Sequence, residues 1–351
     1  MTSAGPDRVL ITGVSNPLGA EVARRLAPHV PHLFGCDVSD PVSALEDMDF
    51  VHADTRHAAI GKLIRQLRID TIVHLAVIVD GPKDDRTIHE TNVIGTMNVL
   101  IGAAPPSSPV RRLVVKSSQA VYGAGPKDPS FFSEEMSIGD RPSTAVARDL
   151  AEMEQLVGEF ALRNEPSRVT TLRLGFRLSE ETSLARYLSL PVVPAFAGFD
   201  PRLQFLHEDD AADVIVRSVL GDHPGVFNVA GEGIVLLSQA IDAMGGRSVP
   251  VLVPYARLLA RLALRTLARV ELPAHIVDVI SYGSVMDCAR LGTEFGWAPV
   301  HSSRDVIHAL VRGREAEVID APSPPQEYEL QVYLQRRRRA AQTAVNAGTD
   351  R

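Results

Sequence analysis

The chain has 351 residues, of which 45% are hydrophobic, which suits one large domain or a domain with a smaller partner lobe. The formal net charge of -7 gives no reason to expect nucleic acid as a partner. The two cysteines, Cys36 and Cys288, lack metal-ligand spacing, which argues against a structural zinc site or a disulfide framework. The sequence shows neither a signal pattern nor an apolar stretch of the roughly 18 to 20 residues that span a bilayer, so a soluble cytoplasmic protein is expected.

The first 175 residues alternate short apolar runs with helical patterns, which is typical of a parallel sheet covered by helices on both faces. The candidate strands are RVLIT (8–12), HLFGCD (32–37), DFVHAD (49–54), TIVHLA (71–76), RLVVKSS (112–118) and VTTLRLG (169–175). Helical patterns lie between them at 19–27, 56–68, 86–104 and 144–163. This order predicts an α/β fold, a Rossmann-type doubly wound parallel sheet with right-handed crossovers.

The chain beyond residue 175 is irregular and rich in proline, as in SLPVVPAFAGFDPR (189–202). This pattern is more typical of a lobe that covers a substrate. We therefore expect a Rossmann domain, an interleaved substrate-binding lobe and a polar, flexible C-terminal tail. Their predicted ranges are 1–175 with later strands from about 203–232, then 176–315, then 316–351.

The segment VLITGVSNPLG places Gly13 after the first strand and Gly19 at the start of the first helix. Glycines at these places let the backbone approach a pyrophosphate seated on the helix N-terminus. Asp37 ends the second strand, 24 residues after Gly13. A carboxylate there can accept both ribose hydroxyls of NAD and would repel the extra phosphate of NADP, so NAD is the predicted cofactor. A buried or merely capping aspartate is the alternative.

Eight segments in chain order resemble motifs of the extended short-chain dehydrogenase/reductases, the NAD-dependent epimerase/dehydratase family. The resemblance runs from about residue 8 to 310. The segments are ITGVSNPLG, HADTRH, VHLAV, TNVIGTMNVL, KSSQAVYG, FLHEDDAADVI, VFNVAGEGIVLLSQAI and LGTEFGWAP. The resemblance implies cofactor contacts from the loop residues Asn16 and Leu18, from Asp54 near the adenine, and from Ala76 and Asn92.

Two residues of the loop depart from the family pattern. Asn16 stands at the middle glycine, and Pro17 follows it. Asparagine is the non-glycine residue that best tolerates a left-handed backbone, so the turn is expected to survive. Pro17 fits the first helical position but removes an N–H that could face the pyrophosphate. We expect dinucleotide binding to persist with some loss.

The catalytic residues of the family are only partly matched. Ser118, four residues before Tyr122, matches the family's catalytic serine, but Thr144 and Arg148 stand where the family has a tyrosine that moves the proton and a lysine. Threonine is too weak an acid to shuttle a proton near pH 7 without a strong base beside it. Arginine can hold the cofactor ribose but effectively never deprotonates. The family's standard mechanism therefore cannot run unchanged.

Two residues could replace the missing tyrosine. Lys116 lies two residues before Ser118, so both side chains are expected on one face of the strand. Desolvation, with Arg148 nearby, would lower the pKa of Lys116 and make it a conceivable acid or base. A lysine that only binds a phosphate or carboxylate is the alternative. Tyr122 is the other candidate, with a packing role at the edge of the site as its alternative.

The second lobe carries three further candidates. Arg202 could contact an anionic group such as a nucleotide-sugar diphosphate, although the family's arginine matches the next position, Leu203. His207 and Asp210 match a family element that anchors the lobe. Because His207 has no metal-ligand spacing around it, no metal is expected.

A basic stripe lies within 255–269, where Arg257, Arg261, Arg265 and Arg269 recur at four-residue spacing beside leucines. Such a helix can lie on an anionic membrane surface or lead toward a lipid-like substrate. The alternative is a half-buried helix with solvated charges.

The resemblance implies an NAD-dependent oxidoreductase, epimerase or dehydratase that acts on a hydroxyl or keto group of a nucleotide sugar or similar alcohol. It also implies a homodimer paired through 86–103 and 144–163. Two alternatives stay open: an NAD-binding sensor, scaffold or partner subunit without turnover, and a sterol- or lipid-type alcohol dehydrogenase. The missing tyrosine favours loss of turnover, whereas retention of Asp37, Asn92 and Ser118 favours an enzyme.

Overall fold

The computed structural model divides the chain into two compact units, 1–310 and 311–351. The described part of the second unit belongs to helix α11 (Ser303–Asp320), and the rest of the predicted tail lies outside the described residues. The boundary expected at residue 175 stays a prediction. The structure describes residues 5–41, 47–80, 84–104, 106, 108–129, 131–136, 138, 144–164, 167–251 and 272–320.

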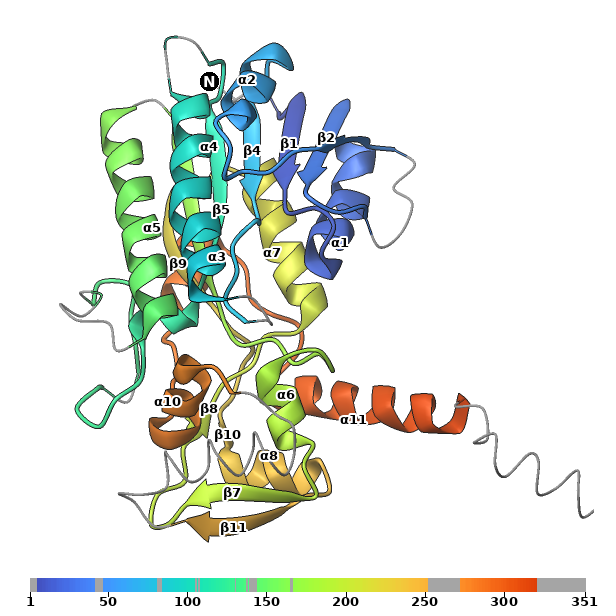
Figure 1. The fold of residues 1–351 in the computed structure, drawn as a ribbon, viewed down its shortest axis with the longest axis vertical. Coiled ribbons are helices and arrows are strands. Elements are labelled where there is room, and N and C mark those ends of the chain that lie inside the picture. The colour runs from blue at the N-terminus through green and yellow to red at the C-terminus, as the bar shows by residue number, and fades with distance from the viewer. Residues whose placement is uncertain are drawn as a thin grey trace, which may run out of the picture. The chain divides into compact units, whose positions relative to one another are not determined.

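One seven-stranded parallel sheet forms the centre of the first unit (Figure 1), in the order β3-β2-β1-β4-β5-β6-β9. The strand order reverses between β1 and β4, and ligands of such sheets bind outside the carboxyl ends of the strands at that point. The predicted fold class is confirmed, and β9 comes from the later segment that was expected to join the sheet. The strands are β1 (Arg8–Thr12), β2 (His32–Asp37), β3 (Asp49–His52), β4 (Thr71–His74), β5 (Arg112–Ser118), β6 (Arg168–Leu174) and β9 (Gly225–Val229).

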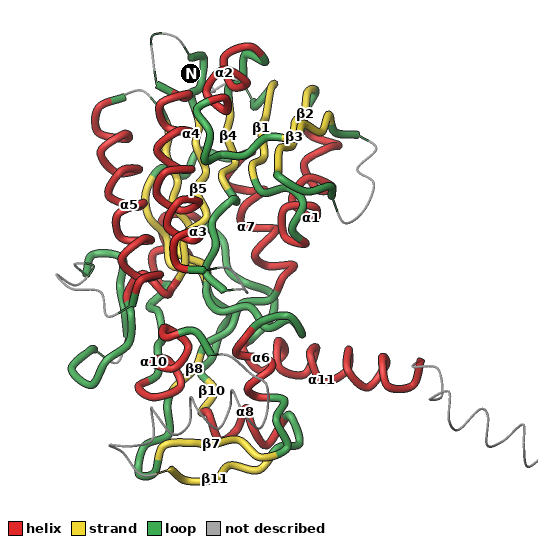
Figure 2. The backbone as a smooth tube through the Cα atoms, in the orientation of Figure 1, coloured by secondary structure: helices red, strands yellow, loops and turns green. Residues whose placement is uncertain are grey.

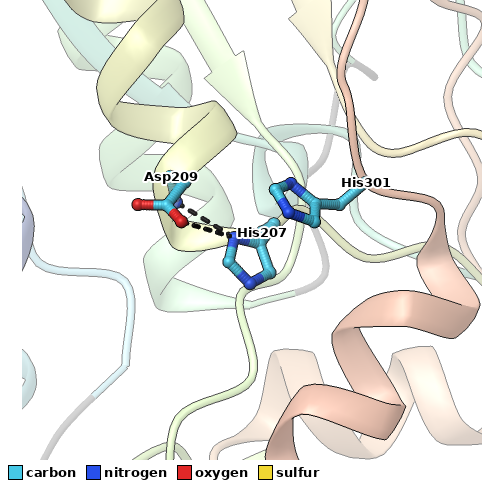
Figure 3. A group of neighbouring side chains, drawn as sticks. All are labelled: His207, Asp209 and His301. Carbon is cyan, nitrogen blue, oxygen red and sulfur yellow. Dashed lines mark hydrogen bonds and ion pairs between the residues drawn. The ribbon is translucent and has the colours of Figure 1, made fainter.

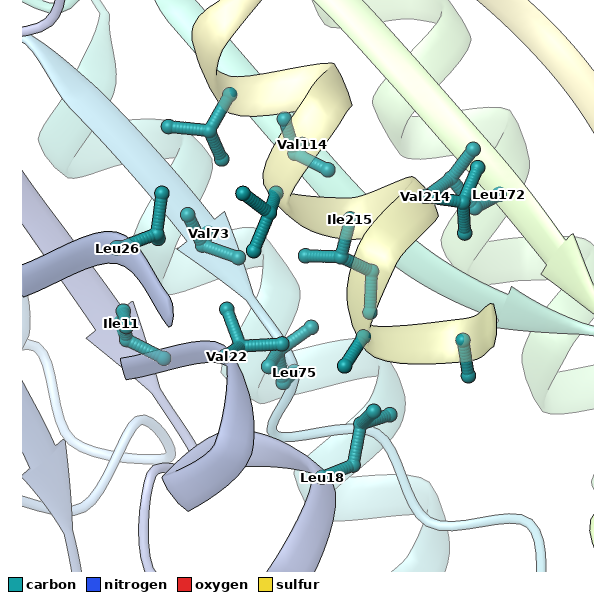
Figure 4. Close-up of a cluster of buried hydrophobic side chains, with 14 of the residues drawn as sticks. Ile11, Leu18, Val22, Leu26, Val73, Leu75, Val114, Leu172, Val214 and Ile215 are labelled. Carbon is teal, nitrogen blue, oxygen red and sulfur yellow. The ribbon is translucent and has the colours of Figure 1, made fainter. Parts of the chain in front are cut away.

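Helices cover both faces of the sheet (Figure 2). Alternate residues of β5 serve the two sides: Val114 packs with α1 and α7, and Val115 packs with α2, α4 and α5. Figure 4 shows the first of these two cores, which Val22 of α1 and Ile215 of α7 help to fill. The helices are α1 (Pro17–Leu26), α2 (Ala59–Gln66), α4 (Thr96–Ala103), α5 (Ala145–Arg163) and α7 (Glu208–Leu220).

The single helix expected over 86–104 is divided into three parts. Helix α3 (Asp85–His89) continues into a π-helical segment, η2 (Glu90–Gly95), before α4 begins. Asn92 lies in η2, and such widened turns are frequent at functional sites. Apolar periodicity does not distinguish this widened turn from an ordinary α-helix.

The first unit also contains a separate two-stranded parallel sheet. In it, β7 (Val192–Phe196) lies beside β11 (Arg247–Val251). The sequence pattern missed β7 because Pro191 and Pro194 make the segment look irregular. Proline is tolerated on an edge strand, and in a pair both strands are edges. The other elements described after residue 175 are α6 (Ser183–Leu188), β8 (Arg202–Leu203), β10 (Val235–Leu236), α8 (Leu237–Ala243), α10 (Ala274–Tyr282) and η4 (Leu291–Phe295). Two short helices lie earlier in the chain, η1 (Ala27–His29) and η3 (Gln119–Tyr122).

Among the helices that the structure describes, none has both the length and the apolar content that crossing a bilayer requires. The basic stripe within 255–269 lies outside the described residues. Its predicted membrane contact and the cytoplasmic location both stay predictions.

Candidate active site

The turn after β1 is shaped by a glycine in a left-handed conformation. Gly13 has a φ of +74°, and a Cβ added there would lie 2.7 Å from the backbone nitrogen of Ala76. Only glycine therefore fits, because a side chain would collide with the backbone that follows β4. The contact brings Ala76 against the loop, next to the point where the strand order reverses.

Asn16 adopts a different conformation from the one expected. Its φ of -80° and ψ of 156° are extended, so the expectation of a left-handed asparagine was wrong. The residue before a proline is pushed toward extended conformations, and Pro17 follows as the first residue of α1. The side chain of Asn16 caps the helix: Oδ1 accepts from the N–H of Gly19 at 2.9 Å, and the amide donates to the carbonyl of Gly13.

The donors at the start of α1 are therefore partly in use. The N–H of Gly19 is bonded to Asn16, and the N–H of Ser15 donates to Asp37 at 3.0 Å. The N–H of Leu18 takes part in none of the hydrogen bonds between described residues. An anion at this helix N-terminus thus has the N–H of Leu18 directly available, and that of Gly19 only if the cap opens.

Asp37 joins the end of β2 to the loop. Its Oδ2 accepts from Ser15, and its Oδ1 accepts from the N–H of Val38 at 2.7 Å. Asp37 thus fixes the backbone of the loop, and its contact with a ribose stays a prediction. Each carboxylate oxygen has two acceptor positions, so one on each oxygen is left for a ribose hydroxyl.

Asp54 forms a tight ion pair with Arg56, 2.6 Å from Oδ2 to the guanidinium nitrogen. Burial raises the pKa of Asp54, but hydrogen bonds from Arg56 outweigh this effect and the net pKa is lowered. The carboxylate is thus ionised, and the guanidinium of Arg56 already balances its charge. Its contact with adenine stays a prediction.

Asn92 is fully buried and clamps the segment after β4. Its Oδ1 accepts from the N–H of Ile78 at 2.7 Å, and its Nδ2 donates to the carbonyl of Ile78 at 2.8 Å. Both ends of the amide are therefore committed to the fold. Such an arrangement positions the segment that carries Ala76, and direct contact of Asn92 with a cofactor stays a prediction.

Lys116 and Ser118 are both buried near the carboxyl end of β5. The pKa of Lys116 is lowered to about 7, chiefly by burial and also by the positive charge of Arg177, while Glu208 opposes the shift. The neighbouring cation is therefore Arg177, not Arg148 as the sequence suggested. Arg177 follows β6 and is paired with Glu208 of α7 at 2.9 Å, a relation between distant segments that the sequence does not reveal.

Thr144 begins helix α5. Its hydroxyl oxygen accepts from the N–H of Ala147 at 3.2 Å, which is the hydrogen bond of an N-cap. Arg148 is exposed in the first turn of the helix. The described hydrogen bonds join neither side chain to Ser118 or Lys116.

Tyr122 belongs to a buried polar network. Its hydroxyl accepts from Arg173 at 2.7 Å and donates to Oδ1 of Asn228 at 2.8 Å. Arg173 is in turn paired with Glu154 at 2.6 Å, and the Ser117 hydroxyl donates to Glu154 at 2.5 Å. Burial raises the pKa of Tyr122. These contacts favour the packing alternative for Tyr122.

Arg202 on β8 and Asp210 in the first turn of α7 have different surroundings. The Arg202 side chain is exposed on β8, so its proposed contact with a phosphate stays a prediction. Asp210 is buried and accepts from the N–H groups of Val300 and His301 at 3.1 and 2.9 Å, so it anchors that segment as expected.

His207, Asp209 and His301 offer ligand atoms within 4.8 Å of one another (Figure 3). The two rings are stacked, with centroids 3.9 Å apart and an interplanar angle of 19°. Ring nitrogens coordinate a metal in the plane of the ring, and two parallel stacked planes do not meet at one ion. Nδ1 of His207 also accepts from the N–H of Asp209, and Nδ1 of His301 is bonded to Asp210. We assign no metal to this group.

Known proteins place these features in one family. Residues 9–230 match the NAD dependent epimerase/dehydratase family. An uncharacterized protein of Mycobacterium tuberculosis is 34% identical over 336 residues, 92% of this chain and 88% of the relative.

Solved structures of low sequence identity share the fold. The UDP-glucose 4-epimerase of Thermotoga maritima, with UDP-glucose, has a TM-score of 0.67 and 18% identity over 89% of this chain and 99% of its own. The dTDP-glucose 4,6-dehydratase of Bacillus anthracis, in complex with NAD, has a TM-score of 0.64 and 15% identity over 88% of this chain and 97% of its own. The chain belongs to the NAD-dependent epimerase/dehydratase family.

Proposed function

We propose that the chain is an NAD-dependent enzyme that oxidises or reduces a hydroxyl or keto group of a nucleotide sugar or similar alcohol. The observation that carries the proposal is that two groups of residues lie at the carboxyl ends of strands in one parallel sheet. Gly13 follows β1 and Asp37 ends β2, and Lys116 and Ser118 lie near the same, carboxyl end of β5. Similar structures hold NAD and UDP-glucose, which supports this choice.

The residues of the loop fit NAD. The backbone at Gly13, the free N–H of Leu18 and the carboxylate of Asp37 would hold the dinucleotide. When bound, NAD supplies the hydride acceptor or donor. The Asn16 cap leaves fewer free donors for the pyrophosphate, so the phosphate end is the weaker part of the site.

Lys116 supplies the proton transfer in this proposal. During oxidation, its neutral amine takes the proton of the substrate hydroxyl, and the hydride of the carbon that bears this hydroxyl would pass to the cofactor, which leaves a carbonyl group. During reduction, the ammonium returns that proton to the carbonyl oxygen. A pKa of about 7 makes both forms of Lys116 available near neutral pH. The Ser118 hydroxyl holds the substrate oxygen beside it.

A second candidate is an NAD-binding protein without turnover. One specific observation favours it: Thr144 caps α5 and Tyr122 is held by Arg173 and Asn228, so neither is positioned as a proton donor. The lipid-alcohol alternative rests on residues outside the described ranges.

We further propose a homodimer paired through 86–103, which ends with α4, and 144–163, which includes α5. Each helix exposes a large apolar side chain, Ile101 at 60% and Leu162 at 83%. Light scattering of the purified chain tests this proposal, and a monomeric mass at micromolar concentration would contradict it.

Calorimetric titration with NAD and NADP tests the cofactor assignment. We expect the parent chain to bind NAD more tightly than NADP, and Asp37→Ala to lose about 10- to 100-fold in NAD affinity because hydrogen bonds to a carboxylate are strong. We expect Asn16→Gly to bind NAD about 2- to 10-fold more tightly, because it frees the N–H of Gly19. Equal affinity of all three proteins for NAD would mean that the dinucleotide does not bind at this loop.

A further inference from the structure

Lys116 is buried without a bonded partner. It is 8% exposed, and it takes part in no hydrogen bond or ion pair with any residue that the structure describes. A buried ammonium without a partner is costly, so burial favours the neutral amine. Charges that stand near this amine without touching it then decide how readily it takes up a proton.

The face of β5 that carries Lys116 packs against the start of α7. Val114, two residues earlier on the same face, belongs to one buried cluster with Leu174 at the end of β6 and with Leu206 and Ala211, which flank the first residues of α7. Helix α7 contacts both β5 and β6, and Figure 4 shows Val114 beside it. Because residues two apart on a strand point to the same face, the Lys116 side chain is directed toward the N-terminus of α7.

An ion pair stands at the same end of α7. Phe176 and Phe205 form a β-bridge, and the N–H of Leu206 donates to the carbonyl of Phe176 at 2.9 Å. These contacts join the segment after β6 to the segment before α7. They bring Arg177 against Glu208, whose charged groups lie 2.9 Å apart and whose side chains are 28% and 42% exposed.

The two charges of this ion pair act on Lys116 with opposite signs. Burial lowers the pKa of Lys116 most, and the positive charge of Arg177 lowers it as well, whereas the negative charge of Glu208 opposes the change. Neither side chain is hydrogen-bonded or ion-paired to Lys116, which has no such partner in the described part of the chain, so both act through space.

The other titratable groups around Lys116 have partners of their own. His74 of β4 is fully buried, and its two ring nitrogens are bonded to threonine hydroxyls. Burial, with a smaller contribution from Lys116, lowers the pKa of His74 to about 3, so this ring is uncharged at neutral pH. The N-cap and first turn of α7 also carry His207, Asp209 and Asp210. The histidine caps the helix, the first aspartate pairs with Arg25 of α1 at 2.6 Å, and the second accepts from two backbone N–H groups.

We propose that Arg177 and Glu208 are positioning residues for proton transfer: Arg177 favours the neutral amine of Lys116, and Glu208 limits this effect while it keeps the guanidinium in place. Neither residue touches the reacting atoms. The ion pair instead sets the pH at which Lys116 changes between acid and base. This assignment rests on the proposed function and adds the regulation of its proton-transferring group.

Lys116 can be titrated directly because the chain has only four lysines, Lys62, Lys83, Lys116 and Lys127. The full chain is labelled with lysine that is isotopically enriched at Cε, and the lysine signals are followed by NMR as the pH is raised. Lys116→Met assigns the Lys116 signal by its loss. We expect Lys116 of the parent chain to titrate at about pH 7, well below the ordinary value of 10.5. This measurement needs neither substrate nor NAD.

Arg177→Gln is expected to raise the midpoint of the Lys116 titration by about 0.5 to 1 pH unit, and Glu208→Gln to lower it by a similar amount. Glutamine can keep a hydrogen bond across the former ion pair in both variants, so the change is chiefly the loss of one charge. Arg217→Gln is the matched control. Arg217 lies in the last turn of α7 and pairs with Asp213 at 2.8 Å, and its loss should leave the midpoint unchanged.

The expected fall in Glu208→Gln separates this role from a structural one. Loosened packing would admit water to Lys116 and raise the midpoint in either variant. A midpoint that does not rise in Arg177→Gln, or does not fall in Glu208→Gln, would overturn the assignment. If Lys116 still titrates at about pH 7 in that case, the proton transfer proposed for it stands without the ion pair. A parent chain in which Lys116 titrates at the ordinary value would overturn both.

Discussion

Replacing Lys116 with methionine is expected to lower turnover by about 10²- to 10⁴-fold, the usual contribution of a general acid or base, while NAD affinity stays unchanged. Methionine keeps the length and apolar character of the side chain but cannot carry a proton. Lys116→Arg is expected to be equally inactive, because arginine keeps the charge and does not deprotonate. Steady-state rates measured with any accepted substrate, beside an NAD titration of each variant, provide the test.

The pH profile separates proton transfer from a merely electrostatic role. Oxidation requires the neutral amine of Lys116, so its rate should rise as the pH passes about 7, and the rate of reduction should fall over the same interval. The residual activity of Lys116→Met should not show this change of rate as the pH passes about 7. A methionine variant with the parent's rates and pH profile would show that Lys116 is not the group that transfers the proton.

The same substitution should stabilise the fold at neutral pH. The pKa of Lys116 falls from 10.5 in the unfolded chain to about 7 in the folded one, so between these values the unfolded chain holds a proton that the folded chain lacks. The free energy of unfolding contributed by this group therefore rises with pH through that interval and is lowest below it. Lys116→Met should flatten this dependence and raise the melting temperature near pH 7.

Replacing Glu154 with leucine is expected to lower the free energy of unfolding by about 3 to 5 kcal/mol. Glu154 and Arg173 have side chains only 6% and 5% exposed, and their nitrogen and oxygen atoms lie 2.6 Å apart. Loss of the carboxylate leaves the guanidinium buried with an uncompensated charge, and it also removes the acceptor of the Ser117 hydroxyl. Urea denaturation of the two proteins measures the difference.

Glu159 provides the matched control on the same helix. It pairs with Arg163 at 3.1 Å, but the side chains of Arg163 and Glu159 are 76% and 41% exposed. Water screens such a pair, so Glu159→Leu is expected to change the free energy of unfolding by less than about 1 kcal/mol. If Glu154→Leu were as mild as the control, the buried pair would contribute no more than a surface pair.

The sequence predicted the sheet well because buried parallel strands appear as short apolar runs bounded by turn residues. The bounds of β1, β2 and β5 match their predicted runs, and Gly13 and Asp37 mark the ends of two of these strands. Strand β7 was missed because a proline such as Pro194 is acceptable in a strand only where no neighbouring strand needs the backbone N–H that proline lacks. The number of neighbouring strands is a tertiary property.

The candidate site was less predictable because partners come from distant segments. The same-face position of Lys116 and Ser118 follows from strand geometry alone, but the Arg177 charge beside Lys116 depends on how β6 ends and how α7 begins. The conformation of Asn16 could have been read correctly, since Pro17 after it disfavours a left-handed backbone and asparagine is also a strong helix cap.

Successive side chains of β5 point to opposite faces of the sheet, and the two faces have different tasks. Lys116 and Ser118 take the positions proposed for chemistry, while Ser117 between them points to the opposite face and bonds to Glu154 of α5. A substitution at position 116 or 118 can therefore change the reaction that the site supports without unpairing the buried charges that hold α5 to the sheet. Chemistry at the mouth of the sheet and attachment of α5 can therefore be altered independently along a single strand.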